Sequence, residues 1–368
     1  MKALLVADGS GGHLSPALEV AAYLAREGAV PQVWYAQRPH ARAMLAGVCD
    51  AWPSSVEIAP IPVAPSRLIG RLWQCGQLWH KAHRWFDACD PDVVVGFGGW
   101  VSAPVLAAAK SRRIACLLHE QNVVMGRANR WLAPWVDRIT LSFPETQPGL
   151  AGRPTIITGL PIRGSIGHLA SAATRERFGF DAQRPTVLVL GGSQGASAIN
   201  RLMMAALPLL SPRERSTWQV IHLAGAADAP DVEAAYHDAQ VSAWVAPFLS
   251  DMAAAYAVAD LAIGRAGACT IGELARCGTP AILIPYPYAG RHQRANAALV
   301  ETVGGGLMIE QAEATPERLL AAARRLLSDE RLRAVMGGHM RSLDSGDATQ
   351  RLGSAILDLA DRRTKHPS

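Results

Sequence analysis

The segment Ala3-Leu-Leu-Val-Ala-Asp-Gly-Ser-Gly-Gly-His13 decides the fold of this chain. It begins with a continuous apolar run, which is typical of a strand buried on both faces of a parallel sheet. A glycine-rich turn follows, and Ser15 and Pro16 predict the N-cap and first turn of a helix that ends at Gly28. This order of strand, turn and helix predicts the opening unit of a doubly wound α/β domain, with a turn that can hold a phosphate.

The same pattern restarts about 180 residues further along the chain. A buried strand is predicted over residues 186–190, and Gly191-Gly-Ser-Gln-Gly195 and an apolar helix follow it. Because 368 residues exceed the size that one core usually supports, we predict two doubly wound α/β domains in tandem. We place them at residues 1–160 and 161–345, and expect a helix over residues 348–361 to pack back on the first. Further strands are predicted at residues 33–36, 93–97, 114–119 and 139–143, and at residues 219–223, 243–246, 261–263 and 281–284.

The composition is that of an ordinary globular protein, with 49% hydrophobic and 18% charged residues, which argues against intrinsic disorder. Six cysteines occur without any C-x-x-C pair, so we expect free thiols. No apolar run reaches the roughly 18 residues that a membrane-spanning helix requires, so any membrane role is expected to be peripheral. The net charge of +5 suits an anionic substrate, an anionic membrane or nucleic acid equally well.

Both glycine-rich turns can bring backbone N–H groups to a diphosphate at a helix N-terminus. Neither turn matches G-x-G-x-x-G, and no acidic residue stands in a ribose position at the end of the strand over residues 33–36. A dinucleotide-dependent dehydrogenase is therefore the weaker hypothesis. Each turn could also be no more than a tight connection between a strand and a helix.

Other polar loops follow predicted strands. Gly96-Phe-Gly-Gly-Trp-Val-Ser102 and His119-Glu-Gln-Asn122 belong to the first domain. In the second domain, residues 264–273 place glycines before a helix, with Glu273 expected in its first turn. That carboxylate either favours the helix dipole or accepts ribose hydroxyl groups. Because ligands collect at the carboxyl ends of parallel strands, we expect one cleft whose polar side chains suit a sugar.

These loops, in this order, resemble the MurG family of nucleotide-sugar transferases over residues 1–361. The resemblance implies the GT-B architecture, in which two Rossmann-like domains with parallel sheets face each other across a cleft. It also implies an inverting enzyme that moves N-acetylglucosamine from UDP-N-acetylglucosamine to the C4 hydroxyl of N-acetylmuramic acid in lipid I, giving lipid II for peptidoglycan. Such an enzyme works at the cytoplasmic face of the plasma membrane, without a cofactor and without a nucleic-acid partner.

The resemblance assigns roles to individual residues. His13 is implied to be essential, either as the general base on the acceptor hydroxyl or as a group that holds the acceptor diphosphate, and an imidazole suits proton abstraction at neutral pH. Glu273 is implied to hold the ribose, the backbone at Leu249 the uracil, and Asn122 and Gln293 the sugar. The full donor set is Ser10, Gly11, Gly12, Asn122, Arg163, Ser193, Leu249, Ala268, Cys269, Thr270, Ile271, Gly272, Glu273 and Gln293.

Two positions depart from the family pattern. His292 stands where a second glutamine is common, which puts one sugar contact in doubt, and Trp100 stands where a tyrosine is expected. The pair Asp90-Pro-Asp92 formally matches an Asp-x-Asp metal motif, but it precedes a strand and lies at the amino end of the sheet. We therefore interpret it as a turn and expect no metal site.

Residues 66–86 form a basic amphipathic segment without an acidic residue. Its basic side chains are Arg67, Arg71, His80, Lys81, His83 and Arg84, and its apolar stripe is Leu68, Leu72, Cys75, Trp79, Ala82 and Phe86, flanked by Trp73 and Trp85. Basic helices rich in tryptophan are typical of surfaces in a lipid interface, although a core-facing helix with a solvated basic face has the same pattern. With the resemblance to an enzyme that has a lipid acceptor, we favour an anionic membrane surface, which Trp131 and Trp135 extend.

Three alternatives remain open from the sequence. The chain could be a related transferase that acts on another lipid acceptor. It could be a UDP-N-acetylglucosamine 2-epimerase, which shares the two-domain shape and would release N-acetylmannosamine without a lipid. A non-catalytic module that binds nucleotide or lipid is the third alternative, and the many polar residues of the loops make it the least favoured.

Overall fold

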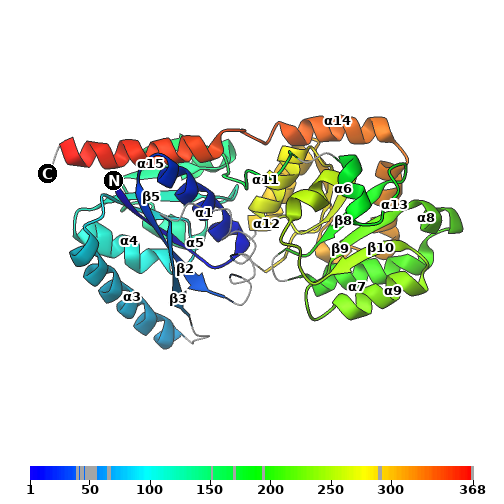
Figure 1. Cartoon of the computed structure of the whole chain (residues 1–368), viewed down its shortest axis with the longest axis horizontal. Helices are drawn as coiled ribbons and strands as arrows, with labels where there is room; N and C mark the ends of the chain where they lie inside the picture. Colours follow the sequence, from blue (N-terminus) through cyan, green and yellow to red (C-terminus); the bar gives the residue numbers. More distant parts are fainter. Residues whose placement is uncertain are drawn as a thin grey trace. The chain divides into compact units, whose positions relative to one another are not determined.

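The computed structural model describes residues 1–38, 41, 45, 56–63, 68–150, 152–168, 171–192, 195–288 and 292–365. The chain divides into two compact units (Figure 1). The first unit comprises Met1–Arg163 together with Ser345–Ser368, and the second comprises Gly164–Asp344. The chain therefore returns to the first unit after it completes the second.

The first unit is built on a seven-stranded sheet with the order β3-β2-β1-β4-β5-β6-β7, in which every neighbouring pair is parallel. The strands are β1 (Lys2–Ala7), β2 (Val30–Gln37), β3 (Glu57–Pro62), β4 (Val93–Gly96), β5 (Ala115–Glu120), β6 (Arg138–Leu141) and β7 (Thr155–Ile157). The helices are α1 (Gly11–Arg26), α3 (Leu68–Cys89), α4 (Ser102–Ser111), α5 (Arg127–Leu132), the 3-10 helix η2 (Pro144–Leu150) and α15 (Ala348–Lys365).

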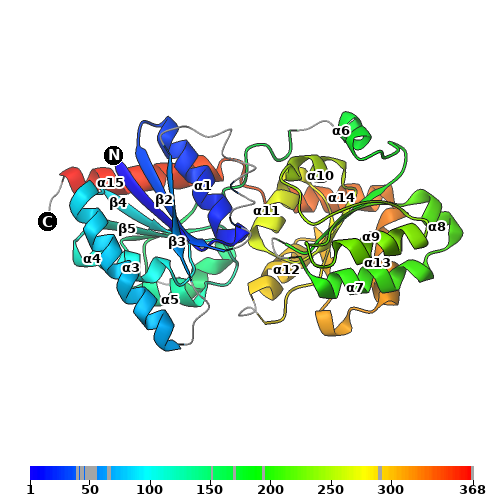
Figure 2. The same cartoon turned by 60° about the horizontal axis from the view of Figure 1, so that its bottom comes forward.

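Helices cover both faces of this sheet because alternate residues of its strands point to opposite sides. Leu5 of β1 lies in a core formed with α1 and α15, whereas Leu4 lies in a core formed with α3 and α4. Figure 2 shows α3 and α4 on one side of the strands and α15 on the other. From α15, Leu352 and Ile356 are fully buried in the core they share with α1. The C-terminal helix thus completes one layer of the first unit.

The second unit repeats the architecture with a six-stranded parallel sheet of the order β10-β9-β8-β11-β12-β13. Its strands are β8 (Thr186–Leu190), β9 (Gln219–Leu223), β10 (Ser242–Ala246), β11 (Leu261–Gly264), β12 (Ala281–Leu283) and β13 (Gly306–Met308). Its helices are α6 (Ser171–Arg177), α7 (Ser197–Ala206), η3 (Leu207–Leu209), α8 (Pro212–Thr217), α9 (Ala229–Asp238), α10 (Met252–Val258), α11 (Ala268–Cys277), α12 (His292–Thr302), η4 (Gln311–Glu313), α13 (Pro316–Leu327) and α14 (Glu330–Arg341).

The predicted fold class and the ten predicted strands are confirmed, with small differences at the strand ends. Three strands of the described residues were not predicted from the sequence, namely β3, β7 and β13. Each of them lies at an edge of its sheet. Edge strands need only one neighbour and tolerate proline, such as Pro60 in β3, so they lack the long apolar run of a central strand.

The five cysteines that lie in the described part of the chain are free.

The predicted start of the first helix was wrong. Ser10 is the N-cap and α1 begins at Gly11, so Pro16 lies inside the helix and Ser15 is not the cap. The end is as predicted: Gly28 has φ +80°, and Ala29 N and Gly28 N donate hydrogen bonds to Leu24 O and Ala25 O. The earlier start matters because it places His13 in the first turn of α1.

In both sheets the strand order reverses next to a glycine-rich turn. The reversal falls between β1 and β4 in the first unit and between β8 and β11 in the second. Side chains at the carboxyl ends of these strands lie where open α/β sheets bind ligands. Each unit therefore carries its own candidate ligand-binding loops at this point of its sheet.

Candidate functional site

His13 is held by the turn that starts α1. Ser10 O accepts hydrogen bonds from His13 N at 3.1 Å and from Leu14 N at 2.9 Å, which fixes the first helical turn. The Ser10 hydroxyl lies 2.8 Å from His13 Nδ1. One ring nitrogen of His13 is therefore engaged by its own loop, and Nε2 lies at the other side of the ring.

Two glycines after β4 leave room for this loop. A Cβ atom at Gly98 would lie 2.8 Å from Cδ2 and 2.9 Å from Nε2 of His13, and one at Gly99 would lie 2.6 Å from Cβ of Asp8. Both glycines have positive φ, +94° and +80°, which a residue with a side chain rarely adopts. The Gly-Gly pair therefore permits a close approach between the β4 loop and the β1 loop that carries His13.

Asp8 anchors the β1 loop. Its carboxylate accepts two hydrogen bonds from Arg38, at 2.5 Å from Nε and 2.8 Å from Nη2, and a third from Ser10 N at 3.3 Å. Hydrogen bonding to the Asp8 carboxylate raises the pKa of Arg38. No local sequence pattern indicates this ion pair, because Arg38 lies 30 residues from Asp8.

Glu120 organises the loop that contains Asn122. Its buried carboxylate accepts hydrogen bonds from Asn122 N at 2.9 Å, Asn122 Nδ2 at 3.0 Å, Gly126 N at 2.9 Å and Asn129 Nδ2 at 2.7 Å. Asn129 Nδ2 also lies 3.5 Å from the position of a Cβ atom at Gly98. The loops after β1, β4 and β5 are thus brought together, with Ser10, His13 and Asn122 among them.

Buried polar groups surround this cluster. His119 is fully buried between Thr140 Oγ1 at 3.0 Å and Ser142 Oγ at 3.3 Å, and burial together with the charge of His13 lowers the pKa of His119 to about 3. His119 is therefore neutral at pH 7. Gln121 Oε1 and Asn129 Oδ1 are buried acceptors without a hydrogen-bond partner among the described residues. Each can accept a hydrogen bond from a ligand hydroxyl.

In the second unit, the predicted donor residues 268–273 form the start of α11. The helix begins at Ala268 with Gly267 as N-cap, so its first amide groups lie just after the carboxyl end of β11 and have no partner within the helix. Asn296 Nδ2 donates to Ala266 O at 3.1 Å and fixes the turn before the helix. A helix N-terminus at this edge can bind an anion.

Glu273 lies in the second turn of α11, not in the first as predicted from the sequence. The helix starts at Ala268, after the last glycine of the loop, and no acidic residue occupies its first turn. Glu273 is 7% exposed, and its Oε2 accepts a hydrogen bond from the buried Tyr256 hydroxyl at 2.8 Å. An interaction with the helix dipole therefore does not explain this carboxylate, whereas acceptance of hydroxyl groups does.

The other predicted residues lie on neighbouring loops or at the unit boundary. Gln293, in the first turn of α12, accepts a hydrogen bond at Oε1 from Tyr286 N at 2.9 Å, and the preceding His292 is half-buried. Leu249 is half-buried between β10 and α10. Arg163 is half-buried and ends the first segment of the first unit. Ser193 lies outside the described residues.

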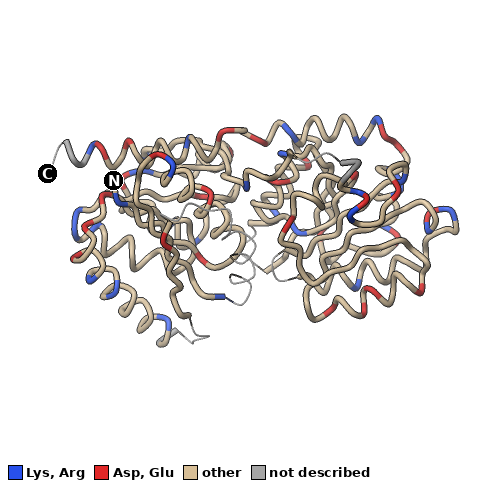
Figure 3. The backbone as a smooth tube through the Cα atoms, viewed as in Figure 1, with Lys and Arg blue, Asp and Glu red and all other residues tan. Residues whose placement is uncertain are grey.

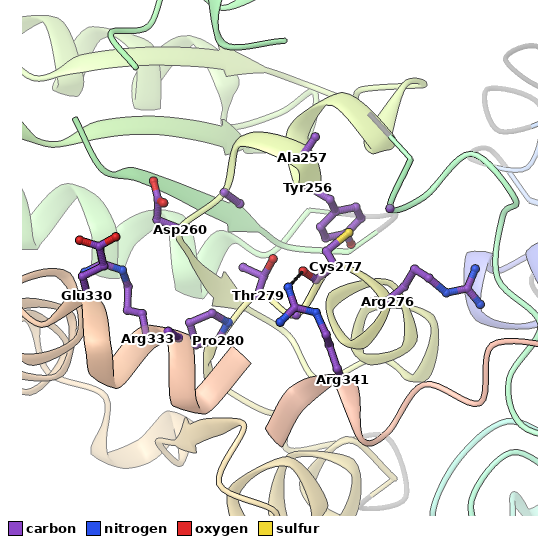
Figure 4. A pocket seen from close by; sticks show the side chains of 14 residues that line it. Tyr256, Ala257, Asp260, Arg276, Cys277, Thr279, Pro280, Glu330, Arg333 and Arg341 are labelled. Carbon is purple, nitrogen blue, oxygen red and sulfur yellow. Dashed lines mark hydrogen bonds between the residues drawn. The ribbon is translucent and has the colours of Figure 1, made fainter. Parts of the chain in front are cut away.

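A hollow of about 480 Å³ in the second unit lies elsewhere (Figure 4). Asp260 and Thr279, which line it, precede β11 and β12, so the hollow opens at the amino edge of the sheet. Arg341 Nη2 donates to Cys277 O at the end of α11, and Arg333 Nη1 donates to carbonyl groups at the end of α13. These guanidinium groups cap helix C-termini, which accounts for them without a ligand.

The pair Asp90-Pro-Asp92 also lies at an amino edge, as predicted. Asp92 Oδ2 accepts a hydrogen bond from Lys2 N at 2.7 Å, and Asp90 has φ +42°, so the segment forms the turn before β4. The sequence analysis assigned no individual role to Glu120, Asn129 or Tyr256. Glu120 is the last residue of β5 and Asn129 lies ten residues after His119, and this closeness to a strand end is the signal that could have indicated both.

Two family models match the chain. The model described as the glycosyltransferase family 28 N-terminal domain matches residues 3–141, and the model described as the family 28 C-terminal domain matches residues 186–346. The first match contains the loops with Ser10, His13 and Asn122. The second contains residues 268–273 and Gln293.

Relatives match over the full length. The UDP-N-acetylglucosamine–N-acetylmuramyl-(pentapeptide) pyrophosphoryl-undecaprenol N-acetylglucosamine transferase of Syntrophotalea carbinolica is 38% identical, covering 96% of this chain and 97% of the relative. The crystal structure of Acinetobacter baumannii MurG superposes with a TM-score of 0.75 at 29% identity, covering 97% of this chain and 99% of the other. The UDP-GlcNAc 2-epimerase of Neisseria meningitidis has a TM-score of 0.74 over 97% of this chain and 100% of the other, but its 12% identity indicates only a shared fold.

Proposed function

Because the chain belongs to the MurG family of glycosyltransferases, we infer that it transfers N-acetylglucosamine from UDP-N-acetylglucosamine to the C4 hydroxyl of N-acetylmuramic acid in lipid I, producing lipid II. The observation that carries this inference is the full-length identity of 38% to a transferase with that activity in its name. Matches confined to one unit would leave either the donor half or the acceptor half of the reaction without support. Here both units match.

For catalysis, His13 acts as the general base on the acceptor hydroxyl. When Nδ1–H donates to Ser10 Oγ at 2.8 Å, Nε2 keeps its lone pair and can accept the proton of the attacking hydroxyl. Gly98 supports this role because a Cβ atom at this position would lie 2.9 Å from Nε2 and would displace the ring. In the alternative role, a protonated His13 holds the acceptor diphosphate and takes no proton.

The donor is bound mainly by the second unit. Glu273, oriented by the Tyr256 hydroxyl, accepts hydrogen bonds from the ribose, and the backbone at Leu249 contacts the uracil. The N-termini of α7 and α11 and the side chain of Arg163 neutralise the diphosphate of the leaving UDP without a metal ion. The remaining contacts of the predicted donor set, including Asn122 and Gln293 on the sugar, belong to this proposal.

The first unit binds the acceptor and an anionic membrane surface at the cytoplasmic face of the plasma membrane. No helix in the described ranges is long and apolar enough to cross a bilayer. Arg67 and the side chain of Leu68 lie outside what the structure describes, but α3 carries exposed Arg71, Lys81 and Arg84 and shows basic positions along its length in Figure 3.

The apolar stripe of α3 divides into two parts. Ala82 and Phe86 are buried against β1 and α4, which corrects the expectation of one continuous lipid-facing stripe. At the other end of the helix, Leu72 and Trp73 are 65% and 66% exposed. Only this first half of α3, together with the exposed Trp131 and Trp135, supports insertion into a lipid interface.

The experiment that tests the function is a transfer assay with lipid I in detergent and a panel of UDP-sugars. We expect lipid II from UDP-N-acetylglucosamine, no product from UDP-glucose, and no product from a diacylglycerol acceptor. His13→Ala should bind UDP as the wild type does and lose turnover by about 10²-fold or more. Release of N-acetylmannosamine without a lipid would establish the epimerase instead, and UDP binding without turnover would establish a binding module.

A further inference from the structure

A buried polar relay lies beneath the glycine-rich turn of the second unit. His222 on β9 is fully buried, with Nδ1 3.1 Å from the Tyr236 hydroxyl and Nε2 3.0 Å from Asn200 Oδ1. Tyr236 and Asn200 are 2% and 1% exposed. Buried polar groups cost free energy unless each is hydrogen-bonded, so a relay of three such side chains in an apolar core calls for an explanation.

The direction of every hydrogen bond in the relay is fixed. Asn200 Nδ2 lies 2.7 Å from Asp228 Oδ2 and 2.8 Å from Ala224 O, two groups that only accept hydrogen bonds, so this atom must be the amide nitrogen. Asn200 Oδ1 then faces His222, whose Nε2 must carry the proton. His222 Nδ1 keeps its lone pair and accepts from the Tyr236 hydroxyl, consistent with burial lowering the pKa of His222 to about 4.

Asn200 connects this relay to the backbone of the turn. Its own N–H donates to Ala196 O at 3.0 Å, and its side chain holds Ala224 O at 2.8 Å. Gly195 of the turn packs closely against the same carbonyl group, because a Cβ atom at Gly195 would lie 2.8 Å from Ala224 O. The side chain of Asn200 therefore holds the segment after β9 against which the turn packs, while its backbone N–H continues α7 from Ala196.

Asp228 ties the start of α7 to the same point. Asp228 is the N-cap residue of α9, and its carboxylate accepts side-chain hydrogen bonds from Ser197 and Asn200. These hydrogen bonds, with that from Ser197 as the larger cause, lower the pKa of Asp228. Ser197 and Asn200 are both in the first turn of α7. The orientation of the α7 N-terminus, whose amide groups can bind a phosphate, thus depends on Asn200 and its partners.

We propose that Asn200, locked in one orientation by His222 and Tyr236, is a positioning residue for the diphosphate of the nucleotide sugar. This inference rests on the proposed function. Asn200 itself does not contact the donor. It sets where the backbone amides of Gly195, Ala196 and the start of α7 lie, and binding of a phosphate by fixed dipoles requires that they stay in place.

The test compares UDP with uridine, which has the same base and ribose but no phosphate. In Asn200→Ala, the Kd for UDP measured by calorimetry should rise about tenfold or more, while the Kd for uridine measured by NMR titration stays within about twofold. Tyr236→Phe, which removes only the far end of the relay, should raise the Kd for UDP by a few-fold and leave uridine unchanged. Steady-state KM for UDP-N-acetylglucosamine should follow the UDP values.

Val232→Ala in α9 is the matched control, because it removes a fully buried apolar group without touching a hydrogen bond of the relay. It should lower the free energy of unfolding and leave the Kd for UDP unchanged. Equal losses of UDP and uridine affinity in Asn200→Ala, or an equal loss of UDP affinity in Val232→Ala, would overturn the inference.

The outcome for Tyr236→Phe keeps the inference testable if Asn200→Ala does not fold. Unchanged UDP affinity in folded Tyr236→Phe would overturn it. Failure of the wild-type chain to bind UDP at all would instead overturn the proposed function.

Discussion

Replacing Gly98 by alanine should slow the chemical step without weakening donor binding. The new Cβ atom would lie 2.8–2.9 Å from the imidazole of His13, whereas ordinary contacts are longer than 3.4 Å, so the ring must move by about 0.5 Å or more. Ser10 Oγ holds Nδ1 at 2.8 Å, so the ring cannot turn away without losing that hydrogen bond. A misplacement of about 1 Å can cost about 10²-fold in rate, so we expect kcat to fall by about 10- to 100-fold.

The alanine at position 98 should also destabilise the folded state through its backbone conformation. At φ +94°, a residue with a side chain costs roughly 1–2 kcal/mol, which urea unfolding would detect. Gly28→Ala separates the two effects, because Gly28 has φ +80° and nothing lies within 4 Å of its Cβ position. It should show a similar loss of stability with unchanged kcat.

The assay is steady-state transfer to lipid I with both substrates varied, together with calorimetric binding of UDP. KM for UDP-N-acetylglucosamine and the Kd for UDP should stay within about threefold of the wild type in Gly98→Ala. If kcat also stays within about threefold, the position of His13 does not control the reaction and the assignment of the base is wrong.

Three further predictions concern other parts of the molecule. Glu273→Gln keeps the shape of the side chain that accepts a hydrogen bond from Tyr256 but removes its charge, so the Kd for UDP should rise by about 10- to 100-fold. The Kd for a 2′,3′-dideoxy analogue of UDP, which lacks the ribose hydroxyl groups, should change little. Equal losses of affinity for both ligands would exclude a contact between Glu273 and the ribose. Burial lowers the pKa of His119 to about 3 and that of His222 to about 4, so below about pH 6.5 the unfolded chain binds protons that the folded chain does not. Each histidine should therefore lower the free energy of unfolding by roughly 2 kcal/mol between pH 7 and pH 5. Urea unfolding measures this loss, and His222→Phe should show a flatter pH dependence than the wild type. Trp73→Ala combined with Arg84→Glu should reduce flotation with anionic liposomes and leave UDP binding unchanged, and undiminished flotation would show that α3 is not the membrane contact.

The sequence predicted the central strands and the two glycine-rich turns because these features are local. Residues 3–7 and 186–190 are apolar runs that fit only a strand buried on both faces, and the glycines that follow leave few alternatives. Pro16 misled the placement of the first helix, since a proline is most common in the first turn but here lies farther inside.

Side-chain partnerships across the fold could not be predicted. The hydrogen bonds of Arg38 with Asp8, of Tyr256 with Glu273, and of His222 with Asn200 and Tyr236 form only because the fold of each unit brings distant segments together. These pairs orient the residues that motifs do indicate. The motif therefore predicts which residues act, and the fold determines how each is held.

The most direct test of the proposed function is the stereochemistry and stoichiometry of the product made by the purified chain in the presence of EDTA. We expect one N-acetylglucosamine to be added per lipid I, in the β configuration by NMR, with one UDP released and no reaction without the lipid. An α-linked product, sugar turnover in the absence of lipid I, or a strict need for a divalent metal would contradict it.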